Sequence, residues 1–216
     1  MDLAQQISLM LSGVGNTIII SILSFLMGIL IGLPLAFIRS YEKELGFFVS
    51  VFEKVFRGIP EIVLMLLFYF GLGLYFPFPF GNAFFTATFV LGLRSAANQS
   101  QIFRGAIRGV GEEQMVAGRS LGLSRVQSIT RVMTPQVFIF STPGLGSEYA
   151  LLIKDSAYAF VLGVPELFKN VELVRANTYD FVTPYVAAAL LYILLTFPIA
   201  TWLDSWGNRK KKKLGL

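Results

Sequence analysis

The chain has 216 residues, of which 55% are hydrophobic and 14% are charged, whereas a soluble domain carries about 25% charged residues. It contains no Cys and no His, which excludes disulfides, a histidine general base and the usual zinc sites. The net charge of +5 comes from basic residues beside apolar runs. We therefore interpret it as a signal of membrane orientation and expect no nucleic-acid partner.

The apolar residues are arranged in long runs. Residues 3–38, 62–93 and 181–203 contain no Asp, Glu, Lys or Arg, which gives runs of 36, 32 and 23 residues. A membrane-spanning helix needs about 20 mostly apolar residues. We predict one transmembrane domain over residues 1–216, with a cytoplasmic loop at 104–131 and five spans at about 15–38, 60–76, 84–103, 135–161 and 183–203.

The distribution of basic residues predicts the orientation of these spans. Of the 18 Lys and Arg residues, 14 lie after the first span, after the third span or in the carboxyl-terminal tail. Loops rich in Lys and Arg remain in the cytoplasm. We therefore expect a multi-pass protein of the cell (inner) membrane, with the amino terminus outside and the carboxyl terminus in the cytoplasm.

The segment between the third and fourth spans has the most informative pattern. Glu112 and Glu113 favour a helix start, Gly122 favours its end, and Ser124 can cap a following turn. We expect two short helices within residues 112–129. Their apolar edge either docks into a groove on a soluble partner or lies along the membrane surface. The residues that share this edge are Val116, Ser120 and Leu121.

This segment resembles the cytoplasmic signature of binding-protein-dependent ABC importer permeases. That signature reads Glu-Ala-Ala, three residues, Gly, nine residues and Ile-x-Leu-Pro. Val116-Ala117-Gly118 stands at the triplet, Gly122 at the Gly position, and Val132-Met133-Thr134-Pro135 at the end. The spacing matches, although the triplet has Val for Glu and Gly for the second Ala. The resemblance implies a coupling helix that contacts an ATP-binding subunit through Val116, Ala117, Gly118, Ser120, Leu121 and Gly122.

Other segments resemble the same family in the same order. Residues 56–60 are similar to its Phe-Arg-Gly-Thr-Pro sequence, residues 152–156 to Leu-Leu-Lys-Asp-Thr, and residues 15–17 to its first-span entry. The resemblance covers about residues 13–203 and is to the polar amino-acid branch. It implies an all-α integral membrane protein with five transmembrane helices and a cytoplasmic coupling-helix loop, the type I ABC importer permease fold.

The resemblance also implies the partners of this chain. The sequence contains no G-x-x-x-x-G-K-[ST] phosphate loop, so we expect neither a cofactor nor enzymatic activity in the chain itself. ATP and Mg would be bound by two separate ATP-binding subunits. A second permease, for which we favour an identical copy over a paralogue, and an extracytoplasmic substrate-binding protein would complete the importer in the lipid bilayer.

Ionisable residues inside spans are costly and usually face a protein interior or an aqueous pathway. Helical spacing places Arg94, Asn98 and Gln101 on one polar stripe, and Glu148 and Asp155 on another. We predict that these five residues form the substrate site. Two carboxylates favour a basic amino acid. Arg94 would either hold the substrate carboxylate or form a structural ion pair, and for Lys154 we favour a structural ion pair with a carboxylate.

Two further features concern helix packing. Pro143, Gly144 and Gly146 allow a break in the fourth span just before Glu148, and the alternative is a tolerated kink. Gly28 and Gly32 form a G-x-x-x-G pair that favours close helix approach.

Two alternatives to the basic amino-acid importer remain open at this point. One is an ion-gradient-driven secondary transporter or channel, and the other is a permease for a non-basic polar amino acid. A membrane scaffold would leave the spacing of the coupling segment unexplained.

Overall fold

The computed structural model describes residues 2–214, and these residues form helices joined by short connections, with no strand. Three elements depart from α geometry, since η1 and η2 are π-helical and η3 is a 3-10 helix. The elements are α1 (Leu3–Tyr41), α2 (Lys43–Gly58), α3 (Glu61–Leu66), η1 (Leu67–Leu72), α4 (Gly73–Tyr75), α5 (Pro77–Phe80), α6 (Ala83–Val110), α7 (Glu113–Ser120), α8 (Arg125–Gln127), η2 (Ser128–Met133), α9 (Thr134–Asp155), η3 (Ser156–Leu162), α10 (Leu167–Thr178) and α11 (Thr183–Leu214).

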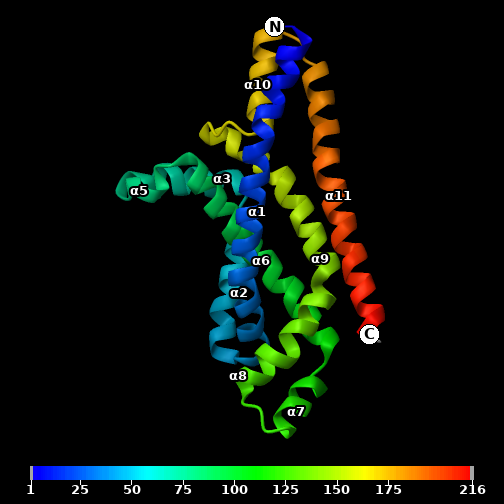
Figure 1. The fold of residues 1–216 in the computed structure, drawn as a ribbon. Coiled ribbons are helices and arrows are strands. Elements are labelled where there is room, and N and C mark those ends of the chain that lie inside the picture. Colours follow the sequence, from blue (N-terminus) through cyan, green and yellow to red (C-terminus); the bar gives the residue numbers. More distant parts are fainter. Residues whose placement is uncertain (1, 215–216) are drawn as a thin grey trace.

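The centre of the molecule is a long helical bundle in which α1 packs along α6, α6 packs on α9, and α9 packs on α11 (Figure 1). Glycine residues of α1 allow α1 and α6 to approach each other closely. A Cβ atom on Gly32 would lie 2.8 Å from the carbonyl oxygen of Ala96 in α6, and Gly28 faces the Gln99 side chain. The G-x-x-x-G pair predicted from the sequence is therefore confirmed as a helix-packing motif.

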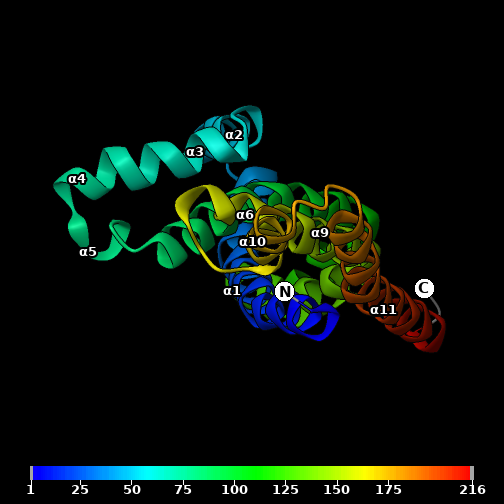
Figure 2. The same ribbon diagram turned by 90° about the horizontal axis from the view of Figure 1, so that it is seen from above.

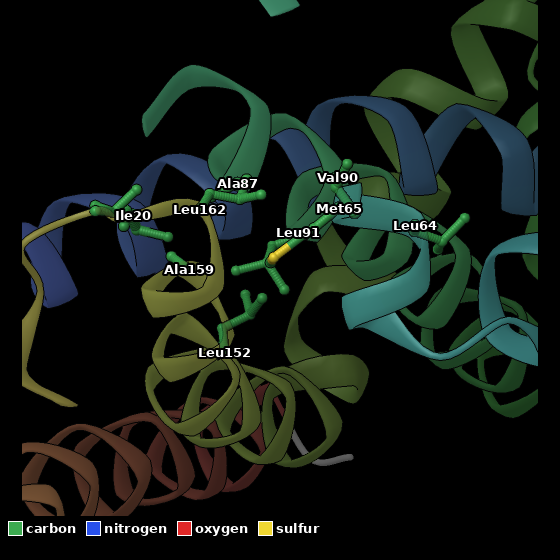
Figure 3. Close-up of a cluster of buried hydrophobic side chains, with 10 residues drawn as sticks. Ile20, Leu64, Met65, Ala87, Val90, Leu91, Leu152, Ala159 and Leu162 are labelled. Atoms are coloured by element: carbon green, nitrogen blue, oxygen red, sulfur yellow. The ribbon is translucent and has the colours of Figure 1, made fainter. Parts of the chain in front are cut away.

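Side chains from distant segments meet in a buried apolar cluster beside α1 (Figure 3). Ile20 of α1, Leu91 of α6 and Leu152 of α9 are fully buried there, and Met65 of α3 joins them. The cluster ties the bundle to the last turn of α3. Burial of such side chains contributes roughly 1.5–3 kcal/mol each relative to aqueous exposure.

A side arm leaves the bundle where α2 ends. The helix pair Lys43–Gly58 and Glu61–Tyr75 is bent by 102°, and Figure 2 shows α3, α4 and α5 extending away from the other helices. Pro60 precedes α3 and has an extended ψ of 139°, which suits a residue that cannot continue the hydrogen bonding of α2. Many apolar side chains of the arm are exposed, and Phe78 is 90% exposed.

The end of the bundle that carries the amino terminus is closed by α10. Its N-cap residue, Glu166, is buried and accepts hydrogen bonds from the backbone N–H groups of Phe168 and Lys169 at 2.7 and 2.6 Å. A Cβ atom on Gly13 of α1 would lie 2.6 Å from the carbonyl carbon of Glu166. The amino terminus and α10 thus lie at one end of the molecule, and α7 and α8 at the other (Figure 1).

The observed helices extend the predicted spans. Helix α1 begins at Leu3 rather than near Gly15, because Asp2 and Gln5 form a reciprocal capping box. Helix α6 runs on to Val110 and ends at Gly111, whose φ of 86° suits glycine. Among the described residues, α1 and α11 are each long and apolar enough to cross a membrane, and the bent pair adds a third span if it is counted as one. The count of five spans stays a prediction.

The structure decides between the two alternatives for the fourth span. The helix α9 continues from Thr134 to Asp155 without a break before Glu148, and it contains Pro143 within its length. A proline removes one helical hydrogen bond but neighbouring groups can satisfy the freed carbonyl. The regular α geometry instead changes at Ser156, where η3 begins.

Candidate functional site

A cleft of about 440 Å³ opens between α2, α6 and α9. Polar residues from all three helices line it, together with a few apolar side chains. The wall residues are Arg57, Asn98, Gln101, Ile102, Gly144, Ser147, Glu148 and Leu151. Three of the five residues predicted for the substrate site, Asn98, Gln101 and Glu148, therefore share one cavity.

Glu148 is the acidic group of this cleft, and its side chain is only half satisfied. The residue is 3% exposed. Its Oε2 accepts a hydrogen bond from Asn98 Nδ2 at 3.1 Å, while Oε1 has no hydrogen-bond partner among the described residues. A buried carboxylate oxygen without a partner costs free energy. Glu148 therefore brings a buried, incompletely hydrogen-bonded carboxylate to the wall of the cleft.

Arg57 supplies the opposite charge in the same cleft, and the sequence analysis did not include it among the site residues. Its Nε donates to Asn98 Oδ1 at 2.9 Å, so Asn98 connects the guanidinium group to Glu148. The only sequence signal for Arg57 was its place in the Phe-Arg-Gly segment. Its role depends on the end of α2 meeting the middle of α6, which no local pattern predicts.

Gln101 connects the cleft to a second polar cluster. Its Nε2 donates to Glu53 Oε2 at 3.3 Å. Glu53, which is 1% exposed, also forms an ion pair with Arg39 at 2.7 Å and accepts from the Ser100 hydroxyl at 2.8 Å. Glu53 therefore holds α1, α2 and α6 together below the cleft. Sequence reasoning missed it because α2 was interpreted as a cytoplasmic loop.

The two remaining predicted site residues pair with each other. Arg94 forms ion pairs with Asp155 and with Glu61, the latter at 2.7 Å between Nε and Oε1. None of these three residues lines the cleft. The guanidinium of Arg94 is thus engaged on two sides, which agrees with the structural alternative stated for it. Lys154 forms no ion pair with any described residue and instead borders a separate cavity beside α11.

The predicted coupling segment forms the far end of the molecule. Helices α7 and α8 are separated by Gly122, whose φ is 81°, and Ser124 caps α8 in a reciprocal box with Gln127. Gly118 is buried, and a Cβ atom there would lie 2.8 Å from Ser128 Oγ in η2. The Gly at the third triplet position therefore allows α7 to pack on η2. The exposed members of the predicted ATPase contact are Val116, Ala117, Ser120, Leu121 and Gly122.

Comparison with known proteins places this geometry in a family. The family described as "Binding-protein-dependent transport system inner membrane component" matches residues 24–212. The chain belongs to this family. It is a membrane transport subunit rather than an enzyme, and the ATPase of such importers is a separate subunit.

The relatives of this family member are amino-acid permeases. The arginine ABC transporter permease ArtQ of Haemophilus influenzae is 33% identical over 88% of each chain. The octopine transport system permease OccQ of Rhizobium meliloti is 32% identical over 87% of this chain and 84% of the relative. The predicted resemblance to amino-acid ABC importer permeases is confirmed.

Solved structures confirm the fold. An amino acid ABC transporter crystallised with histidines superposes with a TM-score of 0.81 at 28% identity, covering 97% of this chain and 99% of the other. An inward-facing MetNI methionine ABC transporter gives a TM-score of 0.83 at 19% identity with the same coverage. The type I importer permease fold predicted from the sequence is therefore correct.

Proposed function

We propose that this permease forms part of the translocation pathway for a polar amino acid with a basic side chain, and that the cleft at Glu148 contacts the substrate. The observation that supports this is the buried carboxylate of Glu148, whose Oε1 has no hydrogen-bond partner in the described part of the chain, in the wall of a cleft that Arg57 also lines. A basic amino acid has a carboxylate for Arg57 and two cationic groups that need acceptors. Two relatives are, by name, permeases for arginine and for octopine.

We assign the other predicted site residues by their partners. Asn98 orients both charged groups through its amide, and Gln101 contributes a polar wall. Arg94 and Asp155 act at a distance from the cleft by fixing α6 to the end of α9 and to α3 through their ion pairs. A neutral polar substrate would leave the Glu148 carboxylate without a compensating charge.

The proposed importer contains two permeases, two ATP-binding subunits and an extracytoplasmic binding protein. We favour an identical second permease, because the projecting arm of α3 to α5 exposes apolar side chains that a second copy would cover, including Leu74, Tyr75 and Phe78. Mg and ATP would remain in the ATP-binding subunits. Residues 112–129 would contact these subunits on the cytoplasmic side, with the amino terminus and α10 facing outward.

The substrate assignment is tested by binding to the purified transporter in detergent. Arginine, lysine, histidine and glutamine are compared as competitors of labelled arginine. We expect Glu148→Gln to weaken arginine binding by at least about tenfold, the equivalent of about 1.4 kcal/mol for one lost charge-assisted interaction. Glu172→Gln, an acidic residue that pairs with Arg175 on α10, is the matched control. Preference for glutamine over arginine in the unmodified protein would refute the basic specificity.

The coupling assignment is tested at Gly122. Its positive φ disfavours any larger residue by roughly 1–2 kcal/mol, although a Cβ there meets no atom within 4 Å. We expect Gly122→Val to insert in the membrane, to bind arginine normally and to lose most ATP-dependent uptake. Gly105→Val, also without a neighbour within 4 Å of its Cβ, is the control. Normal uptake by Gly122→Val would remove Gly122 from the docking role.

A further inference from the structure

A second cavity lies at the end of the molecule that carries α7. It has a volume of about 460 Å³ and is formed by the last turn of α1, the last turns of α6 and the residue before α7. Its polar walls are dominated by guanidinium groups. The residues that line it are Arg39, Ser40, Tyr41, Arg104, Ile107, Arg108 and Glu112.

The charges of this cavity are not balanced within the chain. Three arginines face Glu112 as the single acidic wall residue. Glu53, outside the wall, pairs with Arg39 at 2.7 Å and reaches Arg104 only at 4.0 Å. Arg108 is exposed and forms no ion pair with any described residue. With two carboxylates for three guanidinium groups, the cavity keeps a net positive charge.

The excess positive charge of this cavity is only weakly screened by water, because two of its arginine side chains are largely buried. The side chains of Arg39 and Arg104 are 23% and 20% exposed, so water screens them less than it screens free surface residues. Like charges held together at low exposure repel each other. A guanidinium group presents a planar set of donors that matches the oxygens of a phosphate group. An anion with several oxygens would satisfy donors that the chain leaves open.

The position of the cavity relative to the predicted spans indicates the source of such an anion. Arg39 follows the predicted first span, and Arg104 follows the predicted third span, on the side that carries most basic residues. Basic pockets between membrane helices on the cytoplasmic side are suited to the head groups of anionic lipids. We propose that the cavity bounded by Arg39, Arg104 and Arg108 binds a phosphate group, from either an anionic phospholipid or a soluble phosphate, separately from the amino-acid cleft.

The test measures phosphate binding rather than transport. The full-length permease, purified with its accompanying subunits, is placed in nanodiscs of phosphatidylcholine with or without phosphatidylglycerol, and retained lipid is counted by native mass spectrometry. A second arm measures thermal stabilisation by inorganic phosphate in detergent. Arg108→Gln is the main variant because that residue has no ion pair to lose. Lys54→Gln, an exposed basic residue of α2 outside the cavity, is the matched control.

The two arms distinguish the sources. If phosphatidylglycerol is retained and Arg108→Gln lowers retention about fivefold or more while Lys54→Gln does not, the phosphate belongs to a lipid. If inorganic phosphate alone stabilises the protein with the same dependence on Arg108, the source is soluble. Equal binding to Arg108→Gln and to the unmodified protein overturns the proposal, as does the absence of binding in both arms. Loss of the ATPase subunit from Arg108→Gln, with no change in phosphate binding, would instead assign the cavity to a protein contact.

Discussion

Two carboxylates seven residues apart on one face of α9, Glu148 and Asp155, differ in the side chains that contact them directly. Asp155 pairs with Arg94, which also pairs with Glu61. Glu148 accepts a hydrogen bond from the neutral amide of Asn98, and its second oxygen has no hydrogen-bond partner among the described residues. Both residues are acidic and lie on one helix face, so the local sequence does not distinguish them. The difference between them comes from the side chains that neighbouring helices place beside each carboxylate.

This difference separates a structural group from a binding group. An ion pair whose members satisfy one another has little to offer a ligand, because a ligand would first have to displace the partner. A buried carboxylate oxygen without a partner gains by accepting a donor. Arg94 and Asp155 should therefore act mainly on stability, and Glu148 mainly on binding.

The largest expected effect is a loss of stability, and it tests whether the ion pairs of Arg94 hold the helices together. Arg94→Gln would leave Glu61 and Asp155, whose side chains are 23% and 14% exposed, without their cation. Loss of one member of a fully buried ion pair costs about 3–5 kcal/mol, and the partial exposure of these carboxylates reduces that cost. We expect a strongly lowered melting temperature in detergent, measured by size-exclusion chromatography after heating.

Arg131→Gln, which alters an exposed arginine of η2, should melt like the unmodified protein. If Arg94→Gln kept its stability and lost only arginine binding, Arg94 would belong to the substrate site, as the helical stripe of the sequence suggested.

A further carboxylate, which is buried at the end of the molecule that carries the amino terminus, extends the comparison. Burial raises the pKa of Glu166 from 4.5 to about 7, although two backbone N–H groups at 2.6 and 2.7 Å act against this shift. Between these pKa values the folded protein binds more protons than the unfolded chain. Stability should therefore fall as pH rises from about 4.5 to 7, by at most about 1.4 kcal/mol per pH unit, and level off above pH 7.

Glu166→Gln should remove this part of the pH dependence, as measured by melting temperatures between pH 5 and 8. The range from pH 5 to 8 suits this measurement because the chain has no His and no Cys that would titrate there. The pKa of Glu172 is lowered, chiefly by its hydrogen bond from Tyr185. Glu172→Gln is the control and should keep the slope. An unchanged slope in Glu166→Gln would show that this carboxylate is not the source.

The smallest expected effect on stability is at Glu148. Glu148→Gln keeps an oxygen acceptor and removes a charge that has no full partner, so the free energy of unfolding should change by no more than about 1 kcal/mol. The measurement is the same melting assay, read beside arginine binding. A loss of stability as large as that of Arg94→Gln would mean that the two carboxylates play the same structural role.

Much of the fold could be predicted from local patterns. The apolar runs predicted long helices, and the capping residues predicted the separation of α7 from α8, because Gly122 and Ser124 act within one turn of the chain. Of the break and the kink that the sequence allowed in α9, the break does not occur, because Pro143 is accommodated inside a packed helix. Helix α1 begins before the predicted first span, because Asp2 and Gln5 cap it at Leu3.

The candidate site was predicted only in part. Asn98, Gln101 and Glu148 were identified because polar residues inside apolar segments are conspicuous, and the structure brings them to one cleft. Arg57 and Glu53 were not, because a charged residue on an amphipathic helix has no local sign of burial. Glu53 is nevertheless 1% exposed, since α2 folds back against α1 and α6.

The sequence alone determined the membrane character of the protein, its permease family and the form of the coupling segment, because these follow from hydropathy, residue spacing and capping within short stretches of chain. The tertiary structure decided which charges neutralise one another. Arg94 pairs with residues 33 positions before it and 61 positions after it, and pairing over such distances depends on how the helices pack. The same packing leaves Glu148 with an open oxygen and gathers three arginines around one cavity.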